Sequence, residues 1–300
     1  MIEADSFLKK PTPTVGPVPT VIPGHEPIYQ VSTGVGHRCL WVVAILMLVS
    51  SLIFYILAAR VPVQKRLFHV LASLITTISF LAYFAMATGD GIGFNHIHIV
   101  EKHHKVPDTH TTILREVYWA RFINWALTTP LILINLTLLA GLNGASLLIA
   151  VVADLIMFFS GLMCSYGGSS AHGGRKWAWF TIAALSYLTL VYKIGFQGSR
   201  ATANKESRVR TFYSSLAGYS LVVLLVYPII WAASANARRM SIDAEIIVYA
   251  ILDILLQGVF GYWLLVSHDV TSSISLNSEG FWAHGTSGEG GIRVGEEEGA

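Results

Sequence analysis

Seven stretches of the chain are each long enough and apolar enough to cross a lipid bilayer as a helix. The hydrocarbon core of a bilayer is about 30 Å thick, so a spanning helix needs about 20 mostly apolar residues. Only helices and closed barrels leave no backbone group unpaired in lipid, and the sequence lacks the period-two alternation of barrel strands. We therefore predict an all-α membrane protein, a bundle of seven transmembrane helices at 39–60, 66–88, 114–140, 143–166, 176–198, 212–235 and 242–267.

The composition agrees with a membrane protein and sets limits on its partners. Charged residues make up 13% of the chain, against about 25% in soluble proteins. The net charge is +2 and no basic run is long enough to favour nucleic acid, so the lipid bilayer is the partner that the sequence predicts. Cys39 and Cys164 both fall inside apolar stretches and are interpreted as small buried side chains.

Three regions of different composition follow one another along the chain. Residues 1–37 are rich in proline, and we expect an extended or disordered N-terminal segment without a cleavable signal. Residues 38–267 hold the seven predicted helices. Residues 268–300 are rich in glycine and serine and carry three consecutive glutamates near their end, which predicts a disordered tail; the positive charges of the loops do not decide which side of the membrane either end is on.

Polar and charged residues inside the predicted spans indicate a polar interior, because ionisable groups are costly in lipid. The third span places Arg121 and Asn124 on one helical face, and Asn135 extends that face. Asp154 lies in the fourth span and Asp253 in the seventh. Arg121 and Asp253 fall in the same half of the membrane, so we expect them to form an ion pair. Such residues either fix the helix register or line a functional cavity.

The third span also carries a specific motif. It reads Tyr118-Trp-Ala-Arg-Phe-Ile-Asn-Trp-Ala-Leu-Thr-Thr-Pro130-Leu, which resembles the third helix of the microbial rhodopsins, the bacteriorhodopsin family. The similarity continues through the other spans, over about residues 38–267. It rests there on Tyr83, Ala153-Asp-Leu-Ile-Met157, Trp179, Tyr227-Pro-x-x-Trp231 and Leu252-Asp253.

The resemblance implies a pocket for retinal and a network of polar side chains around it. It also implies that Glu245 is an outer proton-release acid, and that the N-terminus lies outside and the C-terminus in the cytoplasm. The implied pocket residues are Tyr83, Trp125, Thr129, Met157, Trp179, Leu224, Tyr227, Pro228 and Trp231. The implied polar network is Arg121, Asn124, Asp253, Asp154, Asn135 and Glu245.

Four positions depart from the family pattern. The retinal lysine is expected four residues after Asp253, where this chain has Gln257, and residues 240–267 contain no lysine. An amide nitrogen is not nucleophilic and does not form a Schiff base with an aldehyde. Asn124 and Asn135 stand at the positions of the proton acceptor and donor, and amides do not exchange protons near neutral pH. Leu224 replaces a bulky aromatic residue of the pocket.

These departures resemble the lysine-less fungal opsin-related proteins, a plasma-membrane branch associated with heat and other stress. From this resemblance we expect no covalent retinal cofactor, no pumping and no enzymatic activity. The leading hypothesis is a regulator or chaperone-like scaffold for another plasma-membrane protein, such as a proton ATPase. The alternatives are a sensor or carrier that binds retinal or another apolar ligand without a covalent bond, and a passive ion or proton channel. The family resemblance also allows a homo-oligomer.

Five histidines lie between the second and third spans, at positions 96, 98, 103, 104 and 110. Histidines at alternate positions of an extended strand could bind zinc or copper. Their spacing matches no closed structural metal site and no cysteine accompanies them, so we expect a solvated loop without a metal.

Overall fold

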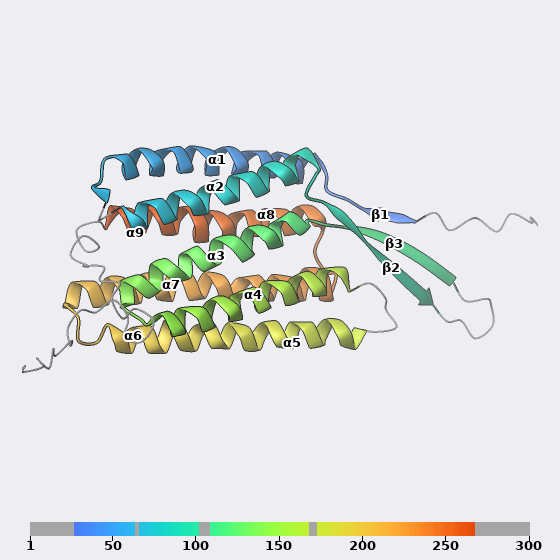
Figure 1. The fold of residues 1–300 in the computed structure, drawn as a ribbon. Coiled ribbons are helices and arrows are strands. Elements are labelled where there is room, and N and C mark those ends of the chain that lie inside the picture. Colours follow the sequence, from blue (N-terminus) through green and yellow to red (C-terminus); the bar gives the residue numbers. More distant parts are fainter. Residues whose placement is uncertain (1–26, 64–65, 102–108, 168–172, 268–300) are drawn as a thin grey trace, which may run out of the picture.

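The computed structural model describes residues 27–63, 66–101, 109–167 and 173–267. Seven helices in this part of the chain are long and apolar enough to cross a membrane, and they lie side by side in one bundle (Figure 1). The seven-helix fold class is thereby confirmed. The spans are Gly34–Ala59, Leu67–Thr88, Trp119–Ala140, Gly144–Tyr166, Gly174–Ala201, Ser207–Asn236 and Ile242–Val266.

Three of the seven spans contain a π-helical segment, so their helices carry more than one label. The first four spans are α1 (Gly34–Ala59), α2 (Leu67–Thr88), α3 (Trp119–Ala140) and α4 (Gly144–Tyr166). The fifth is α5 (Gly173–Leu190), η4 (Val191–Gln197) and α6 (Gly198–Ala201). The sixth is α7 (Ser207–Trp231) and η5 (Ala232–Asn236), and the seventh is α8 (Ile242–Asp253), η6 (Ile254–Val259) and α9 (Phe260–Val266).

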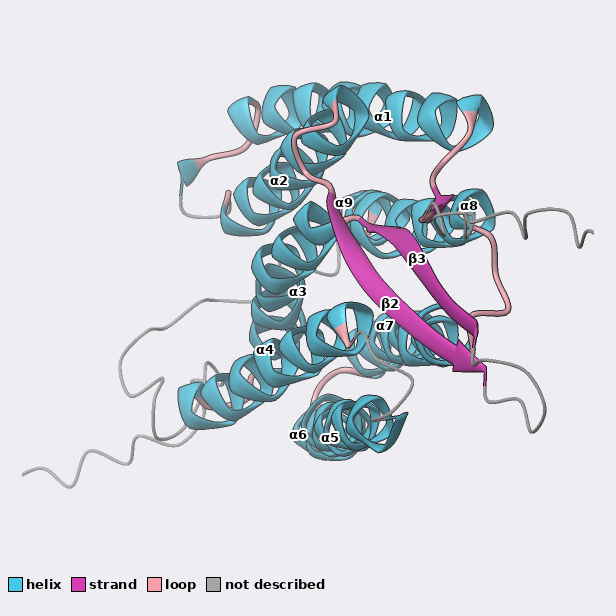
Figure 2. Cartoon of the chain, turned by 90° about the vertical axis from the view of Figure 1, so that its right-hand side faces the viewer, coloured by secondary structure: helices cyan, strands magenta, loops and turns pink. Residues whose placement is uncertain are grey.

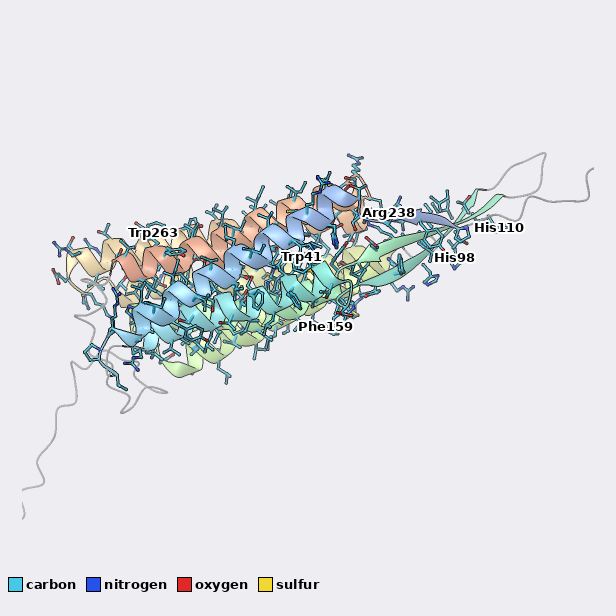
Figure 3. The ribbon with its side chains drawn as sticks, turned by 90° about the horizontal axis from the view of Figure 1, so that it is seen from above. Trp41, His98, His110, Phe159, Arg238 and Trp263 are labelled. Atoms are coloured by element: carbon cyan, nitrogen blue, oxygen red, sulfur yellow. The ribbon has the colours of Figure 1, made fainter. Side chains whose placement is uncertain are left out.

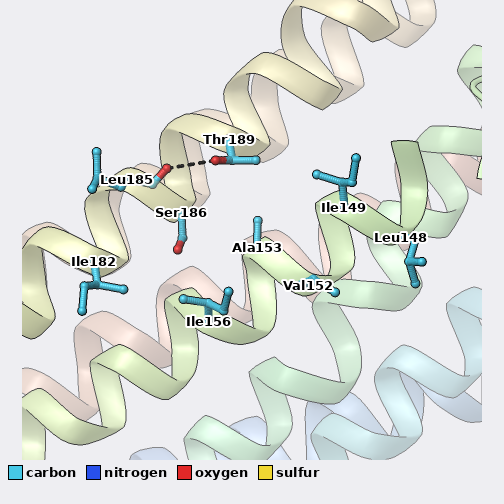
Figure 4. Close-up of a pocket in the computed structure, with 9 residues that line it drawn as sticks. All are labelled: Leu148, Ile149, Val152, Ala153, Ile156, Ile182, Leu185, Ser186 and Thr189. Carbon is cyan, nitrogen blue, oxygen red and sulfur yellow. Dashed lines mark hydrogen bonds between the residues drawn. The ribbon is translucent and has the colours of Figure 1, made fainter. Parts of the chain in front are cut away.

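The outside of the bundle is apolar, as expected of a surface that faces lipid. Large hydrophobic side chains such as Val42, Ile45, Leu185 and Val222 are more than half exposed. Figure 3 shows Trp41, Phe159 and Trp263 among the side chains on the helices. An apolar groove between α4 and α5 opens on this surface, and the hydroxyl of Thr189 beside it donates to the carbonyl of Leu185 (Figure 4). In a bilayer this groove faces acyl chains.

Local sequence signals set the helix ends. Thr33, Asn143 and Ser241 are N-caps whose side chains accept a hydrogen bond from a backbone N–H of the first turn. Gly89 and Gly141 end α2 and α3 with positive φ angles of 93° and 75°, a conformation that costs glycine little. The caps at Gly141 and Asn143 leave only a short connection between α3 and α4.

A three-stranded sheet lies at one end of the bundle and projects beyond it (Figures 1 and 2). Its strands are β1 (Ile28–Gln30), β2 (Gly93–Glu101) and β3 (Thr109–Val117). β3 is central, pairing parallel to β1 and antiparallel to β2. The expectation of a solvated loop between the second and third spans was wrong, because β2 and β3 pair over nine residues. Residues 114–117, predicted to begin the third helix, belong to β3.

The histidines of this region lie on the sheet. His96, His98 and His110 are exposed on β2 and β3, and Figure 3 shows His98 and His110 beyond the helices. His103 and His104 lie outside the described residues, as do 1–26 and the predicted tail 268–300. Within the described part of the chain, no three potential ligands are grouped closely enough to hold a metal ion.

Candidate functional site: a buried carboxylate and its aromatic surroundings

The carboxylate of Asp253 is the centre of the polar interior. Asp253 ends α8 and is fully buried. Its Oδ2 accepts a hydrogen bond from the Tyr83 hydroxyl at 2.6 Å, and its Oδ1 accepts from Trp125 Nε1 and the Tyr227 hydroxyl, both at 2.7 Å. These donors come from α2, α3 and α7, so one carboxylate joins four helices. Hydrogen bonds to a charged acceptor are shorter and stronger than neutral ones, which suits a buried anion.

The predicted ion pair of Arg121 with Asp253 was wrong. Arg121 Nη1 lies 3.3 Å from Glu245 Oε1, two turns before Asp253 on α8. The guanidinium also lies over the ring of Tyr249, 4.6 Å from its centroid. Three neutral donors already surround Asp253, so the arginine points toward the end of the bundle that carries the sheet. The spacing of residues in the sequence could not predict this partner, because the arginine side chain is long and flexible.

The sheet supplies a second arginine that sequence reasoning missed. Arg115 on β3 is buried, and its Nη2 lies 2.9 Å from Glu245 Oε2. The same guanidinium donates to the backbone carbonyl of Met240. Glu245 is thus held between Arg115 and Arg121. Arg115 was missed because the sequence predicted a third helix over residues 114–140, whereas residue 115 belongs to β3.

Tyr118 closes this end of the site next to the sheet. It precedes α3, and its hydroxyl is 2.8 Å from Ser32 Oγ and 3.2 Å from Glu116 Oε2. Burial, with the neighbouring Glu116 carboxylate, raises the pKa of Tyr118 to about 12. The phenol therefore stays protonated near neutral pH and remains a hydrogen-bond donor.

Aromatic rings pack around Trp125 in the middle of the bundle. The ring of Trp125 contacts those of Tyr227, Tyr249, Phe158 and Trp231, with centroids 4.9, 5.1, 5.3 and 6.0 Å away. Edge and tilted contacts of this kind stabilise buried aromatic clusters. The sequence had not indicated Tyr249 or Phe158. Tyr249 could have been found, since it lies four residues before Asp253 on the same helical face.

The structure brings most of the predicted pocket residues into this region but not Trp179. Met157 and Leu224 are fully buried in the same hydrophobic cluster as Trp125. Trp179 is only partly buried and packs edge-on against Phe159, which is 53% exposed. Trp179 therefore lies toward the lipid-facing surface. Thr129 is also buried, and its hydroxyl has no hydrogen-bond partner among the described residues.

Two helix irregularities lie beside the cluster. Pro228 sits inside α7 and has no backbone N–H, so the carbonyl of Leu224, one turn earlier, loses its helical partner. Gln257 lies in the π-helical segment η6, directly after Asp253. Short π-helical segments are frequent at functional sites because they redirect side chains.

Gln257 and Asn124 form a second polar pair in the interior. Asn124 Nδ2 donates to Gln257 Oε1 at 3.3 Å, and both side chains are buried. Gln257 Nε2 and Asn124 Oδ1 have no partner within the described chain. Buried polar groups are hydrogen-bonded in most structures, so unpaired atoms of this kind indicate a place for a bound molecule or water.

The remaining polar residues of the predicted network lie apart from Asp253. Asn135 Nδ2 donates to the carbonyl of Leu131 on its own helix, at 3.1 Å. Asp154 is fully buried on α4, and neither of its carboxyl oxygens has a partner in the described structure. The structure therefore contains two polar centres near Trp125, at Asp253 and at Asn124–Gln257, with Asp154 and Asn135 separate from both.

Fold and site together define a seven-helix integral membrane protein with a buried carboxylate and an aromatic cluster at its centre. Residues 36–270 match the family model described as bacteriorhodopsin-like protein, and the chain belongs to this family. The chain is 45% identical to Opsin-1 of Neurospora crassa over 94% of its length and 92% of that protein.

Solved structures agree with this assignment. The light-driven proton pump LR (Mac) from Leptosphaeria maculans is 44% identical, with a TM-score of 0.77 over 81% of this chain and 98% of that one. The light-driven proton pump rhodopsin of Coccomyxa subellipsoidea is 29% identical, with a TM-score of 0.70 over 80% of this chain and all of that one.

These comparisons correct two expectations from the sequence. The non-photochemical regulator or scaffold is contradicted, because the similar proteins are opsins and light-driven pumps. The expectation of no cofactor is contradicted for the same reason, since a family of light-driven proteins points to a retinal cofactor. The unpaired buried donor at Gln257 Nε2 fits the oxygen of retinal, and the aromatic cluster fits its polyene.

Proposed function

We propose that this protein is a retinal-based photoreceptor of the membrane. The observation that carries the proposal is the Asp253 carboxylate, which receives hydrogen bonds from Tyr83, Trp125 and Tyr227 in the midst of buried aromatic rings. Retinal would supply the absorption of light and a change of shape about its double bonds. The chain's own residues supply a close-packed and water-poor surrounding.

The proposed binding surface is formed by residues already described. Trp125, Met157, Leu224 and Trp231 are buried in one cluster and would contact the polyene. Gly161 leaves room for the Trp231 ring, because a Cβ at this position would lie 2.6 Å from Trp231 Cζ2. Close contact of this kind fixes the orientation of a flat, rigid ligand.

A photoreceptor is favoured over a pump by the two asparagines. Asn124 lies beside Gln257, and Asn135 is buried further along α3. A pump has to move a proton across the membrane in steps, and neither amide takes up or releases one near neutral pH. The effect of light would therefore be a change in the shape of the helix bundle, without proton transfer across the membrane.

The finer placement of the protein follows from the family resemblance. We propose the plasma membrane, with the N-terminus and the sheet outside and the C-terminus in the cytoplasm. Gln257 supports membership of the lysine-less fungal branch of the family. A homo-oligomer, and a membrane partner such as a proton ATPase, remain predictions of that resemblance.

Titration of the purified protein with all-trans-retinal in detergent tests the proposal. Saturable binding with an absorption band distinct from that of free retinal, and a change of the band under illumination, is the expected result. Trp125→Leu should weaken binding, whereas Trp263→Leu on the lipid-facing surface should leave it unchanged. A retinal spectrum identical with and without protein would refute the proposal.

A further inference from the structure

A groove on the surface of the bundle follows the end of the fifth span. It has a volume of about 520 Å³, and four of its residues are spaced four apart along one side of η4, α6 and the turn that follows. Figure 1 shows α6 at the end of the bundle opposite the sheet. The groove is lined by Val191, Gly195, Phe196, Ser199, Arg200 and Ala203.

The polarity of the groove changes along its length. Val191, Gly195 and Phe196 form an apolar part, and Phe196 is 60% exposed. Ser199 and Arg200 form a polar part in the last turn of the span, and both are exposed. Within the described chain, the Arg200 guanidinium has no hydrogen bond or ion pair.

The length of the fifth span places these two parts at different depths in a bilayer. The span covers 28 residues, Gly174–Ala201, which corresponds to about 42 Å of helix, whereas the hydrocarbon core is about 30 Å thick. The span is thus long enough to reach into the headgroup region, and the charge of Arg200 favours its last turn lying there. Val191, more than two turns earlier, lies among the acyl chains.

The end of the bundle that carries this groove is strongly basic. Among the described residues it has six basic side chains and one acidic side chain, which are Arg60, Arg66, Arg200, Lys205, Arg208 and Arg210, with Glu206. At the sheet end, basic residues are accompanied by carboxylates such as Glu116, Asp243 and Glu245. Basic residues at the membrane surface attract anionic lipids. In the orientation proposed above, the basic end faces the cytoplasmic leaflet, where such lipids are enriched.

Arg200 is the basic residue that borders the groove. Arg66 and Lys205 are directed elsewhere, since they donate to the backbone carbonyls of Val61 and Leu139. The groove between α4 and α5, in contrast, is lined by aliphatic side chains and two hydroxyls and has no charged residue at its edge. The groove of the fifth span therefore combines an apolar part with a cation at headgroup depth.

We propose that this groove binds an anionic phospholipid, with an acyl chain against Val191 and Phe196 and the phosphate at Arg200. The guanidinium and the Ser199 hydroxyl would donate to the phosphate oxygens, and such charge-assisted hydrogen bonds are strong. A phosphatidylcholine headgroup has the same phosphate, but its ammonium group adds a positive charge beside a basic surface. The inference goes beyond the proposed function, because it does not involve the retinal pocket.

Lipid titrations of the purified full chain in detergent test the inference. Native mass spectrometry measures the binding of phosphatidylserine and of phosphatidylcholine with the same acyl chains. We expect phosphatidylserine to bind about fivefold more tightly, which is the effect of one arginine near an anionic headgroup. Inorganic phosphate should not displace the lipid, because it has no acyl chain. Equal affinities of the two lipids, retention of neither, or displacement by phosphate would each overturn the inference.

Matched variants separate Arg200 from the general charge of this end. Arg200→Gln should remove the fivefold preference, whereas Arg210→Gln, an exposed residue of the same end outside the groove, should preserve it. Equal effects of the two substitutions would show that lipids are attracted by the basic surface and not held in the groove. Both side chains are exposed, so the variants should fold, and thermal unfolding in detergent confirms this first.

A second pair of variants tests the apolar part of the groove. Phe196→Ala should weaken the binding of phosphatidylserine severalfold, because it removes apolar surface that the acyl chain covers. Leu188→Ala is the control, since Leu188 is 59% exposed on the same span but does not line the groove. Unchanged binding to the Phe196→Ala variant would show that the acyl chain does not lie in this groove.

Discussion

Arg121 of α3 forms an ion pair with Glu245 of α8, at 3.3 Å, rather than with the buried Asp253. The arrangement divides the polar interior into two parts. The Asp253 carboxylate is surrounded by neutral phenol and indole donors. Glu245, in contrast, lies between two guanidiniums at the end of the bundle that the sheet covers. The ion pair between Arg115 of β3 and Glu245 of α8 thus holds the sheet to the helices, in addition to the covalent connections of the chain.

Replacing Glu245 by glutamine should lower the free energy of unfolding. Arg121 and Arg115 are 1% and 6% exposed, and both would lose their counter-ion. Removing one partner of a buried ion pair costs about 3–5 kcal/mol, and we expect about 2–3 kcal/mol here because the Glu245 side chain is 18% exposed. Thermal unfolding in detergent, followed by circular dichroism, measures the loss.

Asp90→Asn is the matched control for this variant. Asp90 is an exposed carboxylate in the turn after α2, where it accepts from the hydroxyl of Thr88. Its neutralisation should change the unfolding free energy by less than about 0.5 kcal/mol. Equal effects of the two substitutions would mean that Glu245 does not hold the arginines.

The helices could be predicted from the sequence because lipid imposes a simple rule on length and apolar content. All seven spans lie where the apolar stretches indicated, but three of their starts differ by five residues. α3 begins at Trp119 and not at 114, because residues 114–117 belong to β3, and α7 begins early, at Ser207. α1 begins early at Gly34, because the side chain of Thr33 accepts from the N–H of Val35 and caps the helix there. The sheet could not be predicted in this way, because β1 and β3 are more than 80 residues apart in the chain.

Asp253→Asn should destabilise the protein more than Asp154→Asn. The Asp253 carboxylate accepts from three donors, and an amide would turn an N–H toward at least one of them. We expect a loss of about 2–4 kcal/mol, since buried donors are left unpaired. Asp154 is equally buried but has no partner in the described residues, so its neutralisation should be neutral or stabilising.

Unfolding midpoints of the two aspartate variants, measured side by side in the same detergent, decide this prediction. The tryptophan emission of Asp253→Asn should also change, because Trp125 Nε1 loses its charged acceptor. A larger loss of stability in Asp154→Asn would contradict the structure's account of the two sites.

The sequence predicted which residues form the site better than it predicted which of them contact one another. Tyr83, Trp125 and Tyr227 were assigned to one pocket from the resemblance, and the structure places all three on Asp253. The partner of Arg121 was missed because a residue type fixes a charge but not the direction of a long side chain. Trp179 was misplaced because a rotation of the helix by a fraction of a turn moves a residue from the core to the lipid.

Gly161→Ala should destabilise the bundle, and Gly218→Ala should not. A Cβ at residue 161 would lie 2.6 Å from Trp231 Cζ2, so the indole would have to move within the aromatic cluster. Overpacking of a core costs about 1–3 kcal/mol. Gly218 is exposed on α7 with no atom within 4 Å of the added Cβ, and alanine there should stabilise the helix by about 0.5–1 kcal/mol.

Unfolding midpoints of the two glycine variants should therefore shift in opposite directions. The two substitutions add the same methyl group to a membrane-spanning helix, so the difference reports the space around each residue. A stabilised Gly161→Ala variant would show that Trp231 does not pack against α4 as described.

The stability of the protein at high pH should depend on Tyr118. Burial raises the pKa of this phenol from 10.0 to about 12, so the folded state keeps the proton that the unfolded chain has lost. The stabilisation is complete below pH 10 and is lost as the pH rises from 10 to 12. Tyr118→Phe should lower stability at neutral pH, because the hydrogen bonds to Ser32 and Glu116 are lost, and should flatten the decline of stability above pH 10.

Unfolding midpoints measured at intervals from pH 8 to 12 give both the stability at neutral pH and the slope of its decline. Tyr29→Phe, on the exposed β1, is the control that keeps the wild-type slope. A Tyr118→Phe variant whose stability declines as steeply as that of the wild type would show that another group causes the alkaline loss.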